Sequence, residues 1–154
     1  MWALSAEEFG EQAARLVERT AGLPADEAWH LEEAKECVYL SQKRWRGRQR
    51  WELHISYSLA YSVPVLWFRA WHPDGSLLKV EELWAETSEA SRLGADPWQA
   101  LTQNTHPVLA TPWYHIHPCR TGQLLAETGA GSLISWLSIF TALLGFHLPL
   151  SLHS

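Results

Sequence analysis

Four consecutive segments between residues 34 and 83, each rich in β-branched and aromatic residues, constrain the fold of this chain most strongly. Turn-forming sequences separate them, at Arg46-Gly47-Arg48, around Pro64 and at His72-Pro73-Asp74-Gly75. Strands joined by such short connections pair antiparallel, because a parallel pair needs a long crossover. We therefore expect a four-stranded antiparallel meander, with strands at residues 34–45, 50–62, 65–72 and 77–83. Pro64 has no N–H to donate to a ladder, so we expect it to begin the third strand after a bend.

A helix is predicted before these strands. Ser5 and Glu8 have the spacing of a capping box, in which each side chain accepts a hydrogen bond from the other residue's backbone N–H. Apolar residues then recur at helical spacing, at Phe9, Ala13, Leu16 and Val17. We expect this helix to end near Arg19.

The second half of the chain is predicted to be less regular. The alternation of apolar and polar residues that is typical of strands ends after Glu86. A short helix is expected at residues 97–103, and residues 104–122 are expected to form a long loop. A C-terminal helix is expected from about Ser132 to just before Gly145. Its length of about 12 residues, or roughly 18 Å, is well below the roughly 30 Å of a bilayer core, so it predicts a buried helix and no membrane span.

The order of these elements predicts an α+β fold: N-terminal helix, four-stranded meander, loop and C-terminal helix, with one face of the sheet covered. The 154 residues suffice for a single domain, residues 1–154. Ten tryptophans indicate an aromatic-rich core, interface or both, and Trp67, Trp71 and Trp113 are candidate interface residues if they do not lie in the core.

Charge and cysteine content limit the possible functions. A formal net charge of -5 argues against a general nucleic-acid binder. Residues 43–51 interleave cations with aromatics, which could bind nucleic acid or an acidic protein, but a solvated hairpin tip is the simpler interpretation. Cys37 and Cys119 are too few for a disulfide framework, and no signal peptide is recognisable, so we expect a cytoplasmic protein.

The sequence His115-Ile116-His117-Pro118-Cys119 is the strongest indication of chemistry. If residues 113–117 are extended, His115 and His117 lie on one face, with Cys119 just beyond a proline bend. Arg120 and the two histidines would favour the thiolate electrostatically, and a helix beginning near residue 120 would add its positive end. Cys119 is therefore a candidate nucleophile.

Other interpretations of this cysteine remain open. Most free cysteines are buried and inert. His115, His117 and Cys119 could bind zinc with His106 or His72 as a fourth ligand, although the usual ligand spacing is missing. A cysteine protease with His117 as base is also conceivable, but no protease signature surrounds the cysteine.

Several motifs in order between about residues 50 and 150 carry a family resemblance. They are Tyr57 to Ala70 (YSLAYSVPVLWFRA), Asp74-Gly75 with Glu82-Leu83-Trp84, Pro97-Trp98 with Thr102-Gln103, His106-Pro107-Val108-Leu109, His117-Pro118-Cys119-Arg120-Thr121, and Ser135-Trp136-Leu137-Ser138-Ile139 with Leu148-Pro149-Leu150. Together they resemble the autophagy-related protein ten family, the ubiquitin-like-conjugating enzymes of the autophagy-twelve conjugation system. The sister family that lipidates the autophagy-eight protein shares His-Pro-Cys but usually has a long acidic insertion in the sheet region, which is missing here.

The resemblance implies a ubiquitin-conjugating-enzyme-like fold and assigns a role to Cys119. This residue would accept the C-terminal glycine of autophagy protein twelve as a thioester from the activating enzyme, autophagy protein seven. It would then pass the glycine to a lysine of autophagy protein five. The resemblance implies a transferase with a cysteine thioester intermediate and no cofactor or metal. A catalytically idle module of the same fold, which only binds a ubiquitin-like protein, is the alternative.

The resemblance also raises the question of what supports the acyl transfer. Typical ubiquitin-conjugating enzymes have a His-Pro-Asn sequence upstream of the cysteine, and its asparagine stabilises the oxyanion. Neither this chain nor the family that it resembles has this asparagine at the usual spacing. His117 and Tyr57 are the candidate substitutes, to orient the carbonyl or the incoming lysine. His115 and Thr121 are weaker candidates, and Tyr57 could instead be a strand residue with a purely structural hydroxyl.

Overall fold

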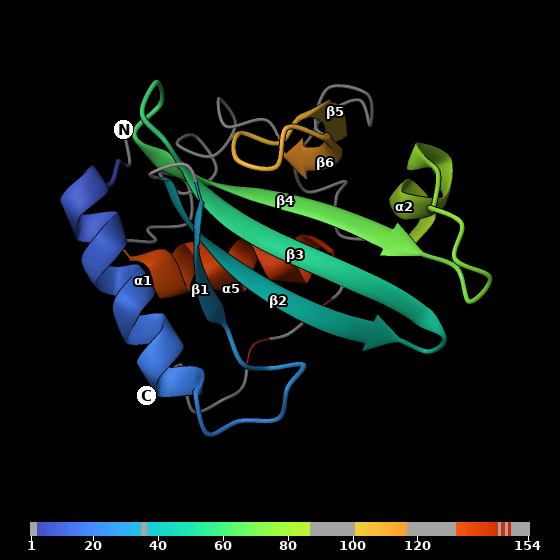
Figure 1. Cartoon of the computed structure of the whole chain (residues 1–154), viewed down its shortest axis with the longest axis horizontal. Helices are drawn as coiled ribbons and strands as arrows, with labels where there is room; N and C mark the ends of the chain where they lie inside the picture. The colour runs from blue at the N-terminus through green and yellow to red at the C-terminus, as the bar shows by residue number, and fades with distance from the viewer. Residues whose placement is uncertain are drawn as a thin grey trace.

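A computed structural model describes residues 3–34, 37–86, 101–116 and 132–144, together with residues 146 and 148. Within these ranges, six strands form one antiparallel sheet in the order β1-β2-β3-β4-β6-β5 (Figure 1). The strands are β1 (His30–Ala34), β2 (Cys37–Arg46), β3 (Gln49–Ser58), β4 (Val63–Trp71), β5 (Leu101–Thr105) and β6 (Pro112–Ile116).

Strands β1 to β4 form a four-stranded antiparallel meander, of which β2, β3 and β4 correspond to the first three expected strands. The turn between β2 and β3 contains Gly47 at φ 59°, a left-handed conformation that glycine adopts without a steric penalty. Pro64 is the second residue of β4 and pairs with Tyr57 of β3. It lies beyond the part of β4 that pairs with β6, where the recorded register is Trp67 with His115 and Phe68 with Tyr114.

Helices α1 (Ala6–Thr20) and α5 (Leu133–Leu143) pack on one face of the sheet, α5 behind it in the view of Figure 1. The capping box at the start of α1 is present: Glu8 N–H donates to Ser5 Oγ and Ser5 N–H donates to Glu8 Oε1, both at 3.1 Å. Gln12 of α1 accepts a hydrogen bond from the backbone N–H of Leu133 at 2.7 Å. This bond joins α1 to the first turn of the C-terminal helix, where backbone N–H groups have no partner within the helix.

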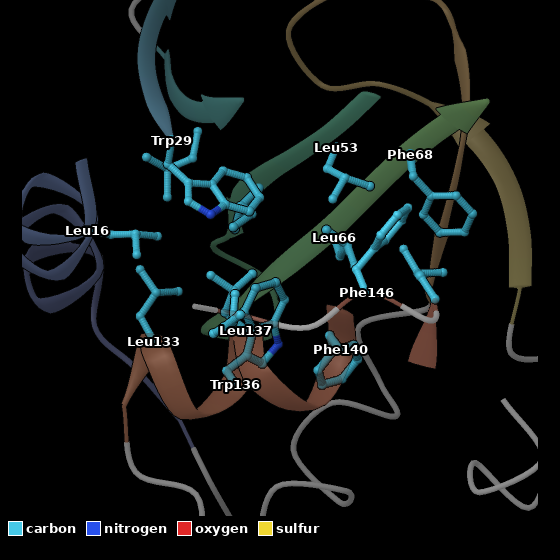
Figure 2. Packing of buried hydrophobic residues seen from close by; sticks show 14 of the residues in the cluster. Leu16, Trp29, Leu53, Leu66, Phe68, Leu133, Trp136, Leu137, Phe140 and Phe146 are labelled. Carbon is cyan, nitrogen blue, oxygen red and sulfur yellow. The ribbon is translucent and has the colours of Figure 1, made fainter. Parts of the chain in front are cut away.

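The core lies between these helices and the sheet (Figure 2). Leu16 of α1 and Trp136, Leu137 and Phe140 of α5 are almost completely buried. They face the alternate residues of the central strands that point toward the helices, namely Trp51, Leu53, Ile55, Leu66 and Phe68. This alternation follows from the two-residue period of a strand, and it leaves the intervening residues for the opposite face.

The opposite face of the sheet has an aromatic layer of its own. A second buried cluster consists of Val65, Trp67 and Trp113. Arg69 lies over the Trp113 ring, with its guanidinium carbon 4.8 Å from the ring centroid. We call this side, on which His54 and His115 also lie, the outer face.

Two expectations about elements were wrong. Residues 77–83 do not form a strand: Leu77 makes only an isolated bridge to Trp71, and helix α2 (Val80–Glu86) begins soon after. Glu82 accepts a hydrogen bond from the N–H of Lys79, which satisfies a donor at the helix start and favours the helix over a strand.

The expected helix at residues 97–103 was also wrong over the described part, because residues 101–103 belong to β5. The expected loop at 104–122 contains the end of β5 and all of β6. Strand β1 begins before residue 34, where no strand was expected. Pairing with neighbouring strands stabilises β1, β5 and β6. The local sequences of these strands alone do not show the alternation of apolar and polar residues that predicts a strand.

Candidate functional site

Strand β6 leads directly into the segment that carries the candidate nucleophile. Cys119, His117 and Thr121 lie outside the described residues, as does the helix expected to begin near residue 120. Residues 112–116 are extended, as the alternation argument required. Because β6 is antiparallel to β4, its last residues run toward the Val63 end of β4, where Pro64 pairs with Tyr57. Tyr57 therefore lies at the end of the sheet toward which β6 runs.

His115 is the residue of the pentad whose surroundings the structure describes best. Its side chain is 3% exposed and lies on the outer face, stacked on Trp67 with ring centroids 4.5 Å apart and an interplanar angle of 15°. Its cross-strand neighbours are Trp67 in β4 and Thr102 in β5. This packing gives His115 a structural role in fixing β6 on the sheet.

Tyr57 lies on the helix face of β3. Its ring packs 5.4 Å from the ring of Phe9, centroid to centroid, and its hydroxyl donates to the backbone carbonyl of Leu4 at 2.5 Å. The hydroxyl therefore joins β3 to the segment before α1. The side chain is half-buried, so part of it remains accessible to solvent.

Below His115 on the outer face, two further histidines form a hydrogen-bonded chain. His54 Nδ1 lies 3.1 Å from His106 Nε2, and His54 Nε2 lies 3.2 Å from Glu52 Oε1. His106 Nδ1 accepts hydrogen bonds from the backbone N–H groups of Val108 and Leu109, both at 3.1 Å.

These contacts fix both tautomers. Because His106 Nδ1 accepts two N–H groups, its proton must be on Nε2, which then donates to His54 Nδ1. The proton of His54 is consequently on Nε2, where it donates to the Glu52 carboxylate. The chain connects the turn after β5 to the centre of β3, and in the sheet β4 and β6 lie between these two strands.

Electrostatics agree with a neutral His106. Burial lowers its pKa from 6.5 to about 4, helped by the charges of His54 and Arg69 and opposed by that of Glu52. The hydrogen bond from His54 lowers the pKa of the Glu52 carboxyl below its usual value, against the opposing effect of burial. The carboxylate end of the chain therefore stays charged at neutral pH while the His106 end stays uncharged.

Aromatic rings enclose this histidine pair. Trp113 lies 4.3 Å from His54 and 5.2 Å from His106, and Tyr39 lies 4.8 Å from His54, all between ring centroids. Trp67 is 6% and Trp113 1% exposed, so these two residues are buried in the outer-face layer and do not meet the condition of exposure set for interface residues. Trp71 is half-buried, and the Arg50 guanidinium lies over it, 4.4 Å from its centroid.

The proposed alternative ligands for zinc lie in different places. His106 is engaged by His54 and two backbone amides, whereas His72 is held by Glu82 at 2.6 Å, beyond the other end of β4. The described ranges contain no group of three or more His, Cys, Asp and Glu residues able to hold a metal ion.

The basic run at residues 43–51 forms the β2–β3 hairpin, and its cations are packed on aromatic rings. Arg44 and Arg46 lie over the ring of Phe146, at 4.6 and 4.3 Å from its centroid. Arg46 also donates to the carbonyl of Leu144 and lies 4.8 Å from the Trp51 ring. These two arginines thus attach the hairpin to the C-terminal segment, a structural role that the sequence pattern did not suggest.

Sequence reasoning named His106 as a possible zinc ligand and as part of a family motif, but it missed the hydrogen-bond partners of this residue. His54 is 52 residues away in sequence and Glu52 lies two residues before it. A pattern of Glu52, His54 and Ser56 on alternate residues of a predicted strand was the available signal, since it places three polar groups on one face. Only the packing of the turn after β5 against the side chains of β3 turns that pattern into a network.

No helix in the described part of the chain is long and apolar enough to cross a membrane.

The family model for the autophagocytosis associated protein, active-site domain, matches residues 8–151. The human ubiquitin-like-conjugating enzyme ATG10 is 34% identical over 140 residues, which are 84% of this chain and 63% of that protein. The Arabidopsis thaliana enzyme of the same name is 32% identical over 116 residues, 66% of this chain and 52% of that protein. The chain thus spans less than two thirds of the length of either relative.

Solved structures agree on the fold. A crystal structure of the autophagic E2 Atg10 superposes with a TM-score of 0.65 at 20% identity, covering 94% of this chain and 99% of that one. Solution structures of KmAtg10 give a TM-score of 0.57 at 23% identity, covering 92% and 95%. The expected α+β, conjugating-enzyme-like fold is confirmed. The chain therefore belongs to the autophagocytosis-associated active-site-domain family, as a relative of the ubiquitin-like-conjugating enzymes ATG10.

Proposed function

We propose that this protein is a ubiquitin-like-conjugating enzyme of autophagy that carries its cargo as a glycyl thioester on Cys119. The observation that carries the proposal is the match of the active-site family model across residues 8–151, which includes the only cysteine that directly follows the His-Pro sequence. The cargo is autophagy protein twelve, received from the activating enzyme, autophagy protein seven. The acceptor is a lysine of autophagy protein five.

In the first step the Cys119 thiolate attacks the carbonyl carbon of the cargo's terminal glycine, which is bound to the activating enzyme as a thioester. The intermediate collapses by releasing the activating enzyme's cysteine as a thiolate, so one thioester replaces another without an oxidant or reductant. Thiolates are the reactive form of cysteine, and a thioester remains activated toward amines.

In the second step a neutral lysine amine attacks the same carbonyl carbon. The isopeptide bond forms, Cys119 leaves as a thiolate, and the amine proton passes to a base. Both steps develop negative charge on the carbonyl oxygen, so a hydrogen-bond donor close to Cys119 would accelerate them.

His117 and Tyr57 are the proposed supporting residues. An imidazole can hold or accept a proton near neutral pH, which suits His117 to the lysine step. Tyr57 is supported by its position at the end of β3, beside the end of β4 toward which β6 runs. Its hydroxyl is bonded to Leu4, so it would have to exchange that bond to contact the carbonyl.

The test is adduct formation with purified activating enzyme, ATP and the ubiquitin-like protein, resolved without reductant. The parent protein should give an adduct that thiols remove, and Cys119→Ser should give an ester adduct that resists thiols. Cys37→Ser is the matched control, because Cys37 is exposed and should leave the adduct unchanged. Absence of any adduct that depends on residue 119 would leave the idle binding module of the same fold as the better description.

A further inference from the structure

A short backbone ladder joins the β5–β6 hairpin to the rest of the sheet. Among the described residues, nine residue pairs join β3 to β4 and five join β5 to β6, but two join β4 to β6. Figure 1 shows the hairpin beyond β4, at that side of the sheet. Its turn is closed by bonds of its own: His106 N–H donates to the carbonyl of Thr111 at 2.8 Å, and Ala110 N–H to that of His106 at 3.0 Å. Backbone hydrogen bonds therefore tie the hairpin together more firmly than they tie it to β4.

Ring contacts on the outer face hold the hairpin against the sheet. The turn folds over this face, because the His106 ring lies 5.6 Å from that of Tyr39 in β2 and 5.3 Å from that of Trp67 in β4, between centroids. Trp113 of β6 packs 4.3 Å from His54 of β3. Burial of such rings stabilises the contact, but apolar burial is largely non-directional. It favours a hairpin that covers the outer face and fixes its position along the strands only weakly.

The hydrogen bond from His106 Nε2 to His54 Nδ1 adds direction to this packing. It is 3.1 Å long, and the two side chains are 0% and 2% exposed. A change of tautomer could not replace it, because a proton on His106 Nδ1 would face the N–H groups of Val108 and Leu109. Without His54 as acceptor, the Nε2–H of His106 would be a buried unsatisfied donor, which is costly. Glu52 accepts from the other nitrogen of His54 and so keeps Nδ1 an acceptor.

We propose that His54 is a positioning residue: it anchors the β5–β6 hairpin to β3 and thereby sets where β6 ends, immediately before the reactive segment. Cys119 comes three residues after Ile116, the last residue of β6, so their Cα atoms are at most roughly 11 Å apart. A cysteine this close in the chain depends on the position of the strand end. Acyl transfer is sensitive to such placement, because a shift of about 1 Å in a reacting group can cost on the order of a hundredfold in rate. The consequence for the reaction rests on the proposed function, whereas the anchoring of the hairpin does not.

Two substitutions of His54 separate this bond from the other contacts of the residue. The amide oxygen of asparagine falls near the Nδ1 position of histidine, and the amide nitrogen of glutamine near its Nε2 position. His54→Asn can therefore still accept from His106, whereas His54→Gln can donate to Glu52 but cannot accept from His106. Both variants lose the ring contacts, so their difference isolates the bond. Thr20→Val is the matched control, because it removes a buried hydrogen bond on the helix side of the sheet, from Trp29 N–H to Thr20 Oγ1 at 3.0 Å.

The first measurement is amide hydrogen exchange of the 154-residue protein. In His54→Gln the amides of residues 113–116 should exchange about tenfold faster than in the parent, because loss of a buried hydrogen bond favours local opening. The amides of α1 should keep their parent rates. In His54→Asn and Thr20→Val the rates at residues 113–116 should stay close to those of the parent. The anchoring is refuted if His54→Gln does not accelerate exchange at residues 113–116, or if His54→Asn or Thr20→Val accelerates it equally.

The second measurement is single-turnover formation of the Cys119 thioester with activating enzyme, ATP and the ubiquitin-like protein. His54→Gln should lower the saturating rate about tenfold or more and leave the half-saturating concentration unchanged, since the placement of the thiol is disturbed and binding is not. His54→Asn and Thr20→Val should resemble the parent. A saturating rate of His54→Gln equal to that of the parent would overturn the positioning role. If the parent itself forms no thioester, the proposed function fails, and the exchange measurement alone decides whether His54 anchors the hairpin.

Discussion

His106 is held in one tautomer and one charge state by its neighbours. Two backbone amides donate to its Nδ1, and its Nε2 faces His54. A second proton on Nδ1 would displace both amides and place a positive charge in a site that is 0% exposed. The turn between β5 and β6 therefore depends on a neutral imidazole.

This dependence predicts acid sensitivity. The pKa of His106 is about 4 in the folded protein against 6.5 ordinarily, so between these values only the unfolded chain binds the proton. The free energy of unfolding should fall as pH drops from about 6.5 to about 4, by up to roughly 3 kcal/mol from this residue. Above pH 6.5 the contribution is fully present. Urea denaturation at pH 7.5, 5.5 and 4.5 measures it.

His106→Gln should flatten that pH dependence relative to the parent, at a cost in stability at pH 7.5. His30→Gln is the control, because His30 is exposed and should leave the slope unchanged. Protonation of Glu52 lowers the free energy of unfolding further, but only below about pH 4.5, since its pKa in the folded protein is lowered from that value. Equal slopes for parent and His106→Gln would contradict the assignment.

Tyr57 offers a second prediction at this scale. Tyr57→Phe removes the bond to Leu4 and should cost about 1 kcal/mol of unfolding free energy. If the hydroxyl also supports the reaction, transfer of the cargo to lysine should slow roughly tenfold or more while thioester formation still occurs. Tyr39→Phe is the control on the outer face. A stability loss with unchanged transfer would make Tyr57 purely structural.

Among single residues, those that belong to motifs could be named as candidates from the sequence, whereas contacts between distant parts of the chain could not be predicted. Cys119 and His106 stand in recognisable motifs. The partnership of His106 with His54 requires β3 to lie near the turn after β5, which no local spacing reveals.

Among elements, those with a clear local signal were predicted well. Helix α1 has both its capping box and its apolar period, and the structure contains both. Strand β1 has the sequence His-Leu-Glu-Glu-Ala and an almost entirely exposed burial pattern, so the alternation that identifies strands is missing. At residues 77–83 the apolar residues fit either period, and the hydrogen bond from the N–H of Lys79 to Glu82 favours the helix.

The capping box predicts a measurable contribution to stability. Ser5→Ala should lower the free energy of unfolding by about 1 kcal/mol, because the N–H of Glu8 loses its acceptor. Ser5→Asp should restore most of it, since a carboxylate caps equally well. Thermal or urea unfolding of the three proteins provides the comparison. A Ser5→Ala protein as stable as the parent would show that packing alone holds the start of α1.

On the scale of the whole molecule, the C-terminal segment closes the core. Phe146 packs edge-on against Trp51 at 5.3 Å between centroids and accepts Arg44 and Arg46 over its ring. It therefore joins the β2–β3 hairpin to the segment that follows α5 (Figure 2).

Phe146→Ala should consequently destabilise the protein by about 3 kcal/mol or more, through lost burial and lost cation–π contacts. Leu59→Ala is the control, since Leu59 is 81% exposed, and it should change stability by less than about 0.5 kcal/mol. Denaturant midpoints of both variants test this. A cost near that of the control would contradict the packing of Phe146.

The central claim is that residue 119 carries the cargo's terminal glycine. The direct measurement is mass-spectrometric mapping of the adduct that Cys119→Ser forms with activating enzyme, ATP and the ubiquitin-like protein, after proteolysis. The account predicts an ester-linked glycine remnant on residue 119. A remnant on Cys37 or on a lysine of this chain, or no remnant at all, would contradict it.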